Sequence, residues 1–171
     1  KDYAVLISTA AGAWRYLIGD TVRFVDKENC EIIITGRTKH FLSLVGEHLS
    51  VDNMNKAIQL VGEKLNVSIP EFTVAGVPHG NFFAHHWYVA CNDTVDAEQL
   101  RIAIDEKLKE LNDDYAVERK SALKEVFLDV LTEQQFLDFM AAKGKVGGQH
   151  KFPRVLKGQM LEDWQRFLRR E

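Results

Sequence analysis

Several charged or polar residues in this sequence are of the types, and at the spacing, that bind nucleotides. Asp20 closes a Tyr-x-x-Gly-Asp segment that starts at Tyr16, Arg37 follows a glycine, and Lys151 lies in the segment QHKFPR near the far end. A carboxylate just after a glycine turn can accept hydrogen bonds from a pair of sugar hydroxyls, while arginine and lysine offer fixed and mobile positive charge to phosphate. The pattern therefore indicates nucleotide chemistry, divided between two distant parts of the chain.

Each of these residues also has an explanation that needs no ligand. An aspartate after a glycine is commonly a turn residue that hydrogen-bonds its own backbone. A lone arginine is commonly part of a surface ion pair of small energetic value, and a lone lysine is an ordinary solvated side chain. A wider pattern is needed to favour the nucleotide interpretation.

Longer segments resemble known families in the order in which they occur. Residues 16–58 resemble the end of the adenylate-forming superfamily, which includes acyl-CoA synthetases, luciferase and peptide-synthetase adenylation domains. Residues 108–120 (LKELNDDYAVERK), 136–144 (FLDFMAAKG) and 149–154 (QHKFPR) resemble the auxin-responsive promoter family of acyl-acid amido synthetases. The resemblance covers nearly the whole chain from Tyr16 onward, and the ordered succession is more specific than any one segment.

The resemblance implies roles for the residues of the first motif. Asp20 would bind the ribose hydroxyls of ATP, Arg37 would hold the ribose or nearby phosphate oxygens, and Tyr16 would belong to the same nucleotide-binding motif. Lys39 falls at the hinge of the superfamily, where a change of backbone dihedrals turns the C-terminal domain between two half-reactions.

The resemblance implies that Lys151 is the catalytic residue. From a mobile loop it would contact the acyl carboxylate and an α-phosphate oxygen, and stabilise the negative charge that builds up as carboxylate attacks phosphorus. The sequence departs here from the superfamily's commoner Gly-Lys element. Lys157, which precedes Gly158, is therefore a competing candidate, and Lys145 is a further one.

The implied reaction belongs to a larger, two-domain enzyme. An intact enzyme would convert a carboxylic acid and ATP, with Mg2+, into an acyl-adenylate and pyrophosphate, and would pass the acyl group to the amine of an amino acid. The chain starts in a strand without an initiator Met, so we expect residues 1–36 to end an N-terminal adenylation domain and residues 37–171 to form the mobile C-terminal domain. That N-terminal domain would hold most of the ATP, Mg2+ and acyl sites, and the fragment alone would be inactive.

Other functions stay open. An acyl-CoA ligase would share Asp20, Arg37 and the hinge but would form a thioester. A non-catalytic small-molecule-binding α+β module would owe its Gly-Asp and Gly-Arg pairs to turns, and an interaction domain would use the terminal helix and expose a large apolar patch.

Composition and charge exclude several classes of protein. The 171 residues are 46% hydrophobic and 27% charged, which is typical of a globular chain. A net charge of -3 without clustered lysine and arginine argues against a nucleic-acid partner, and no apolar run is long enough to cross a membrane. Cys30 and Cys91 fall in strand-like segments without a disulfide framework, which indicates a reducing, cytoplasmic compartment.

The histidines do not form a recognisable metal motif. His79, His85 and His86 are close in sequence, but adjacent residues of a strand point to opposite faces. No cysteine pair or helical His-x-x-x-His completes a tetrahedral set, so we expect structural histidines and no metal.

Periodicity predicts a compact α+β fold. Strands are expected at residues 3–8, 20–26, 31–35, 41–45, 72–77, 86–92 and 125–130. Helices are expected behind N-caps at Ser50, at Thr94 or Asp96, and at Thr132, with a short helical turn around Tyr115 and a terminal helix at residues 161–168. The order of elements predicts a small mixed sheet flanked by helices, preceded by a β-hairpin piece of the upstream domain.

Overall fold

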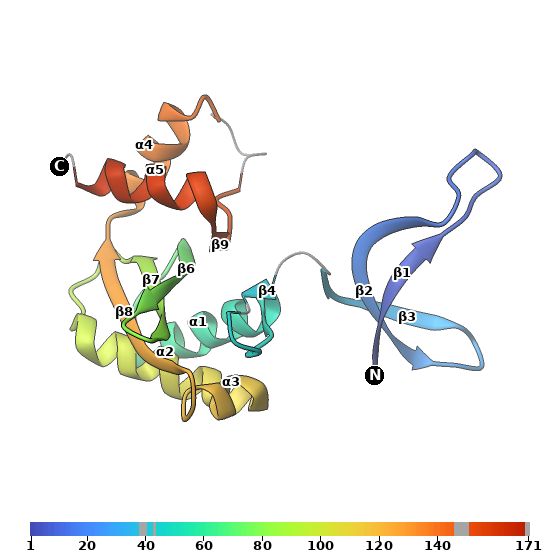
Figure 1. The fold of residues 1–171 in the computed structure, drawn as a ribbon, viewed down its shortest axis with the longest axis horizontal. Coiled ribbons are helices and arrows are strands. Elements are labelled where there is room, and N and C mark those ends of the chain that lie inside the picture. Colours follow the sequence, from blue (N-terminus) through green and yellow to red (C-terminus); the bar gives the residue numbers. More distant parts are fainter. Residues whose placement is uncertain (38–40, 43, 146–150, 170–171) are drawn as a thin grey trace.

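The computed structural model describes residues 1–37, 41–42, 44–145 and 151–169. Its first part is an antiparallel sheet of β1 (Asp2–Ile7), β2 (Tyr16–Asp26) and β3 (Glu31–Arg37), in the order β1-β2-β3. The predicted hairpin is therefore β2 and β3, and β1 pairs with its other edge. Figure 1 shows this sheet apart from the body that contains the helices.

The three-stranded sheet buries little of its own apolar surface. Val22 is its only core residue among those described, whereas Trp14 is 80% and Ile34 is 73% exposed. Further large apolar side chains of this sheet are exposed at Tyr3, Leu6, Tyr16, Leu17, Ile18, Phe24, Val25, Ile32 and Ile33. Exposed apolar side chains in such number are typical of a surface that binds another protein surface, a membrane or a ligand.

The position of Cys30 differs from the strand predicted for it. Cys30 lies in the turn between β2 and β3 with a φ of 55°, and its side chain is exposed. The carboxylate of Asp26 accepts hydrogen bonds from the backbone amides of Glu28 and Asn29, which ends the strand and builds the turn. Cys91 is buried directly after β7, and both cysteines are free thiols.

The second part is built on a four-stranded sheet of β6 (Phe72–His79), β7 (Phe82–Ala90), β8 (Leu123–Leu131) and β9 (Val155–Leu156), in the order β8-β7-β6-β9. The central pair is antiparallel, and both outer pairings are parallel. Its helices are α1 (Val51–Leu65), α2 (Ala97–Leu111), α3 (Asp113–Glu118), α4 (Glu133–Ala142) and α5 (Gly158–Leu168). The predicted small mixed sheet flanked by helices is confirmed.

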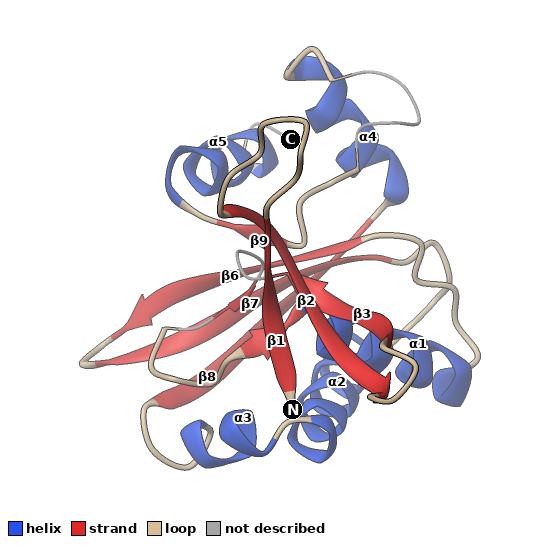
Figure 2. Cartoon of the chain, turned by 90° about the vertical axis from the view of Figure 1, so that its right-hand side faces the viewer, coloured by secondary structure: helices blue, strands red, loops and turns tan. Residues whose placement is uncertain are grey.

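The helices form a layer on each side of the sheet, as Figure 2 shows. Trp87 and Val89 of β7 pack into the core that includes α1 and α2, whereas Tyr88 and Ala90 pack into the core that includes α4 and α5. This alternation follows from the two-residue period of a strand. Within the described residues, no helix is long and apolar enough to span a bilayer.

Local capping signals were predicted correctly. Ser50 caps α1 and forms a capping box with Asn53, and Thr132 forms a capping box with Gln135 at the start of α4. Of the two candidates for α2, Thr94 and Asp96, the cap is Asp96. In each case a side-chain oxygen accepts hydrogen bonds from amides that the helix leaves without an intrahelical partner.

Several predicted strands have different bounds. The strand predicted at residues 20–26 begins at Tyr16, so Asp20 lies within β2 and not after a turn, and the strand predicted at residues 86–92 is Phe82–Ala90. The strand predicted at residues 41–45 is only β4 (Phe41–Leu42), which pairs with β5 (Leu49–Ser50), because the amides of Leu44 and Val45 donate to a side chain instead of a strand. The predicted loop at residues 78–81 is also too long. His79 still pairs with Phe82, so only two residues form the turn, with Gly80 at a φ of +59°.

Candidate functional site

Asp20 and Arg37 lie opposite each other in the three-stranded sheet. Asp20 is a half-buried residue of β2, and its cross-strand partner in β3 is Arg37. Gly19 has a φ of 91°, a conformation that strongly favours glycine. Tyr16 starts β2 opposite Ile7, and its side chain is 60% exposed. The sheet register thus brings together an acidic and a basic position that the sequence separates.

Lys39, the predicted hinge residue, lies outside the described residues. The description resumes at β4, which begins at Phe41.

Lys151 is an exposed residue outside any helix or strand. The residue after it, Phe152, is only 5% exposed and packs with its ring centroid 4.8 Å from that of Phe136 and 5.1 Å from that of Trp164. The lysine side chain therefore projects into solvent from a backbone that is fixed on its C-terminal side.

The segment that follows Lys151 is fastened to β6. The Oγ1 hydroxyl of Thr73 donates to the carbonyl oxygen of Pro153 at 2.7 Å, and the amide of Val74 donates to the carbonyl of Arg154 at 3.0 Å. The Arg154 guanidinium donates to the carbonyl of Phe72 at 2.9 Å, lies 4.3 Å from the centre of that residue's ring, and pairs with Glu71.

The competing lysines occupy different positions. Lys157 is the N-cap residue of α5, so its backbone belongs to the start of a helix. Lys145 is exposed just after α4. The four-stranded part of the fold carries all three lysine candidates, whereas Asp20 and Arg37 belong to the separate sheet of Figure 1.

A buried pair of Glu47 and His85 was missed by the sequence analysis. Both side chains have 0% exposure, and the Nε2 atom of His85 lies 3.0 Å from Oε1 of Glu47. The Glu47 carboxylate also accepts hydrogen bonds from the amides of Leu44 and Val45, at 2.9 and 3.0 Å. A glutamate that follows a glycine gives no signal of burial, because its partner lies 38 residues away.

The hydrogen bonds keep Glu47 ionised. Burial by itself would raise the pKa of Glu47, but the bonds from His85 and from the backbone amides of Val45, Glu47 and Leu44 outweigh it and lower the pKa from 4.5 to about 2. Burial likewise lowers the pKa of His85, against the raising effect of Glu47. At neutral pH the pair is therefore a carboxylate with a neutral imidazole that donates from Nε2.

His86 faces the opposite side of the sheet, as predicted. Its Nε2 atom lies 2.9 Å from a carboxylate oxygen of Asp129, and its ring stacks on Tyr88. No group of three His, Cys, Asp or Glu side chains is placed to hold a metal ion in the described part of the chain.

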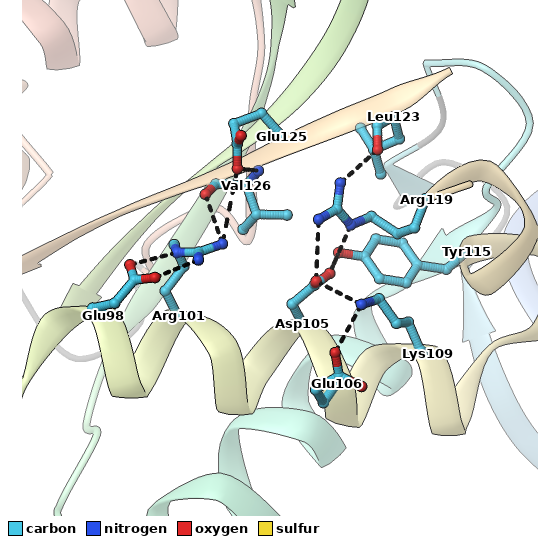
Figure 3. A network of polar contacts seen from close by, with 10 residues as sticks. All are labelled: Glu98, Arg101, Asp105, Glu106, Lys109, Tyr115, Arg119, Leu123, Glu125 and Val126. Carbon is cyan, nitrogen blue, oxygen red and sulfur yellow. Dashed lines mark hydrogen bonds and ion pairs between the residues drawn. The ribbon is translucent and has the colours of Figure 1, made fainter. Parts of the chain in front are cut away.

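A second polar network joins α2, α3 and β8, as Figure 3 shows. Asp105 is 5% exposed and accepts hydrogen bonds from the hydroxyl of Tyr115 at 2.7 Å and from Arg119 at 2.8 and 3.1 Å. Lys109 adds an ion pair at 2.9 Å. Arg119 also donates to the carbonyl of Leu123 at 2.6 Å, so one guanidinium links the end of α3 to α2 and to the start of β8.

Comparison with protein families agrees with this architecture. The model of the GH3 family C-terminal domain matches residues 52–159, which is more than half of the chain. The chain belongs to the GH3 family. The model of the GH3 family central domain matches residues 1–36. The resemblance to acyl-acid amido synthetases that the sequence suggested is thereby confirmed at the level of the family.

Solved structures of the GH3 family share the fold. The structure "GH3.15 acyl acid amido synthetase" matches with a TM-score of 0.73 and 23% identity, over 96% of this chain and 33% of that chain. The structure "AtGH3.15 acyl acid amido synthetase in complex with 2,4-DB" matches with a TM-score of 0.73 and 21% identity, over 96% of this chain and 32% of that chain. This chain thus spans about a third of the length of these relatives. No curated protein matches it.

The Glu47 and His85 pair should make this GH3 domain sensitive to acid. The stability that Glu47 contributes is complete above its unfolded pKa of 4.5 and is lost as the pH falls toward 2. His85 acts in the same direction, since the unfolded imidazole binds a proton below its ordinary pKa of 6.5 and the buried one resists it. Urea denaturation between about pH 7 and pH 3 should show the free energy of unfolding falling, with about 2–3 kcal/mol due to Glu47.

The control for this pH dependence is Glu47→Gln. The variant should start less stable and lose less stability between about pH 5 and pH 3 than the unsubstituted chain. An equally steep loss in the variant would mean that other carboxylates cause the acid sensitivity.

Proposed function

We propose that this chain is the C-terminal part of an ATP-dependent acyl-acid amido synthetase. The full-length enzyme activates a carboxylic acid as an acyl-adenylate and transfers the acyl group to the amine of an amino acid. The observation that carries this proposal is the GH3 family match over residues 52–159, together with the GH3 central-domain match over residues 1–36. The two solved relatives are named as acyl acid amido synthetases, which supports amide formation over thioester formation.

The chemistry explains why activation is needed. A carboxylate oxygen is a poor leaving group, whereas AMP leaves readily when an amine attacks the acyl-adenylate. In this proposal Asp20 accepts the ribose hydroxyls, Arg37 binds the ribose or phosphate, and Tyr16 adds a nucleotide contact. Lys151 neutralises the charge that develops at the α-phosphate. ATP and Mg2+ are held mainly by the upstream domain, and Lys39 is the hinge between the two half-reactions.

The test is ATP-pyrophosphate exchange by the full-length enzyme with a panel of carboxylic acids. We expect exchange with at least one acid, its loss on removal of Mg2+ by chelation, and an amide product when amino acids are added. An acyl-CoA product with coenzyme A and no amide with any amino acid would establish the thioester alternative. Absence of exchange with every acid would contradict adenylation itself.

We further propose that residues 1–36 belong to the upstream domain and residues 37–171 to a mobile C-terminal domain. The exposed apolar side chains of the three-stranded sheet support this division, because its only described core residue is Val22. Both hydrophobic clusters of the second part consist of residues from Leu42 onward. We expect the chain to act in the cytoplasm as part of the larger enzyme, and to be inactive alone.

This division predicts how the two pieces behave when separated. Residues 37–171 should unfold in one cooperative urea transition, while a peptide of residues 1–36 should show the circular dichroism of an unfolded chain, because so small a sheet lacks a core. A cooperatively folded peptide of residues 1–36 would contradict the division at residue 36.

A further inference from the structure

The turn formed by residues 44–47, which we call the 44–47 turn, is held from inside by its own carboxylate. Glu47 accepts hydrogen bonds from the amides of Leu44 and Val45. Gly46 has a φ of +116° and His48 a φ of 41°, so the residues on both sides of Glu47 have positive φ. His48 has a side chain and is strained there, which requires compensation from the surrounding structure.

One rung of the four-stranded sheet holds this turn in place. Gly76 of β6 and His85 of β7 are cross-strand partners. His85 contacts the Glu47 carboxylate, and the side chain of Leu44 lies so close to Gly76 that an added Cβ would come within 2.4 Å of it. The turn is therefore seated on the sheet by a polar contact and an apolar contact side by side.

The polar contact between Glu47 and His85 carries a free-energy cost that an apolar contact would not. Nδ1 of His85 is buried without a hydrogen-bond partner among the described residues, and an unsatisfied buried group costs about 1–3 kcal/mol. Apolar side chains of similar volume commonly stabilise a core at least as well as buried charged groups do, and the Glu47 carboxylate is such a group. What a directional pair adds is one defined geometry, and Tyr115 stacks on the His85 ring with 5.7 Å between centroids to keep it oriented.

The same strand that holds the turn also holds the segment after Lys151. Gly76 contacts the 44–47 turn, and three residues earlier Thr73 donates to the carbonyl of Pro153. Packed and hydrogen-bonded groups therefore join the turn, through β6, to Pro153, which lies two residues after Lys151. On the N-terminal side of the turn lies β4, which begins two residues after Lys39.

We propose that Glu47 and His85 are positioning residues that hold the 44–47 turn rigidly against β6 and β7. A rotation at Lys39 then brings Lys151 to one defined position. This inference rests on the proposed function, and it adds to it a rigid coupling between the hinge side of the domain and the catalytic lysine. Neither residue touches substrate. They act by fixing the position of the Lys151 side chain relative to the substrate.

The test uses the full-length enzyme with His85→Leu. This substitution removes the hydrogen bond to Glu47 and fills the same space with an apolar side chain. We expect kcat for ATP-pyrophosphate exchange to fall about ten- to hundredfold, because small misplacements of a catalytic group have effects of this size. The KM values for ATP and acid should stay within about twofold, since the upstream domain holds both substrates. Hydrogen exchange should show faster exchange of the amides of Leu44 and Val45.

Two further variants make the test specific. His85→Gln can still donate to Glu47 and should recover most of the lost kcat. His86→Leu removes the adjacent imidazole from the opposite face of the sheet and should leave kcat for ATP-pyrophosphate exchange unchanged. If His85→Leu does not fold, Gly76→Ala tests the same seat by displacing Leu44, and the same fall in kcat with unchanged KM is expected.

The outcomes separate this inference from the proposed function. Wild-type kcat in His85→Leu despite faster amide exchange would overturn the coupling, and unchanged amide exchange would overturn the rigid hold on the turn. A rise in KM equal to the fall in kcat/KM would also contradict it. A wild-type enzyme without pyrophosphate exchange would overturn the proposed function and the coupling to catalysis, whereas amide exchange would still report on the rigid hold on the turn alone.

Discussion

Replacing Lys151 with alanine in the full-length enzyme should lower the rate of ATP-pyrophosphate exchange by about 10²- to 10³-fold. The loss follows from the proposed role of the ammonium group, which opposes negative charge that develops only in the transition state. Because the side chain is exposed and lies outside any helix or strand, the free energy of unfolding should change by less than about 0.5 kcal/mol. Exchange kinetics and urea denaturation of the same variant check both statements.

The matched controls are Lys157→Ala and Lys145→Ala. Both lysines lie near Lys151 in sequence, and their removal should leave most of the exchange activity. Loss of exchange in Lys157→Ala with activity retained in Lys151→Ala would transfer the catalytic role to the N-cap residue of α5. Partial loss in both would point to a shared electrostatic effect instead of one catalytic lysine.

Replacing Asp105 with alanine should have the largest effect on stability. The substitution leaves Arg119 without its buried carboxylate and removes the acceptor of the Tyr115 hydroxyl (Figure 3). Breaking a buried pair by removing one partner costs about 3–5 kcal/mol, because the remaining charge is buried without compensation. Urea denaturation should show this loss as a lower midpoint with little change in slope.

The control for this network is Glu98→Ala on the same helix. Glu98 pairs with Arg101 at 2.6 Å, but its side chain is 64% exposed. Exposed pairs of this kind contribute about 0–1 kcal/mol. If both variants lost a similar free energy of unfolding, the loss in Asp105→Ala would come from substitution within α2 and not from the buried network.

The parts of the fold that depend on local signals could be predicted from the sequence. Ser50, Asp96 and Thr132 each cap a helix, and the capping oxygen and the amides it satisfies lie within three residues of each other. The central strands were also found, because their apolar residues occur at strand spacing. The ends of strands were predicted less accurately, since the end of β4 depends on the Glu47 side chain and the end of β6 on the turn at Gly80.

The parts that depend on distant contacts could not be predicted. β9 has two residues, and only its pairing with β6 makes it a strand. Glu47 and His85 meet across 38 residues, and the sequence indicated only that His85 and His86 face opposite sides. Asp20 and Arg37 were singled out by motif and resemblance, and their opposite positions in the sheet are consistent with a shared ligand, but their roles remain predictions.

The pairing of β6 with β9 has a consequence for biosynthesis. It brings together residues about 80 positions apart, as the hydrogen bond between Thr73 and Pro153 illustrates. Contacts of such long separation form later than a hairpin such as β6 and β7. We expect the outer edge of β6 to stay unpaired until residues 155–156 have left the ribosome, so that nascent chains stalled before that point would be the species that aggregate.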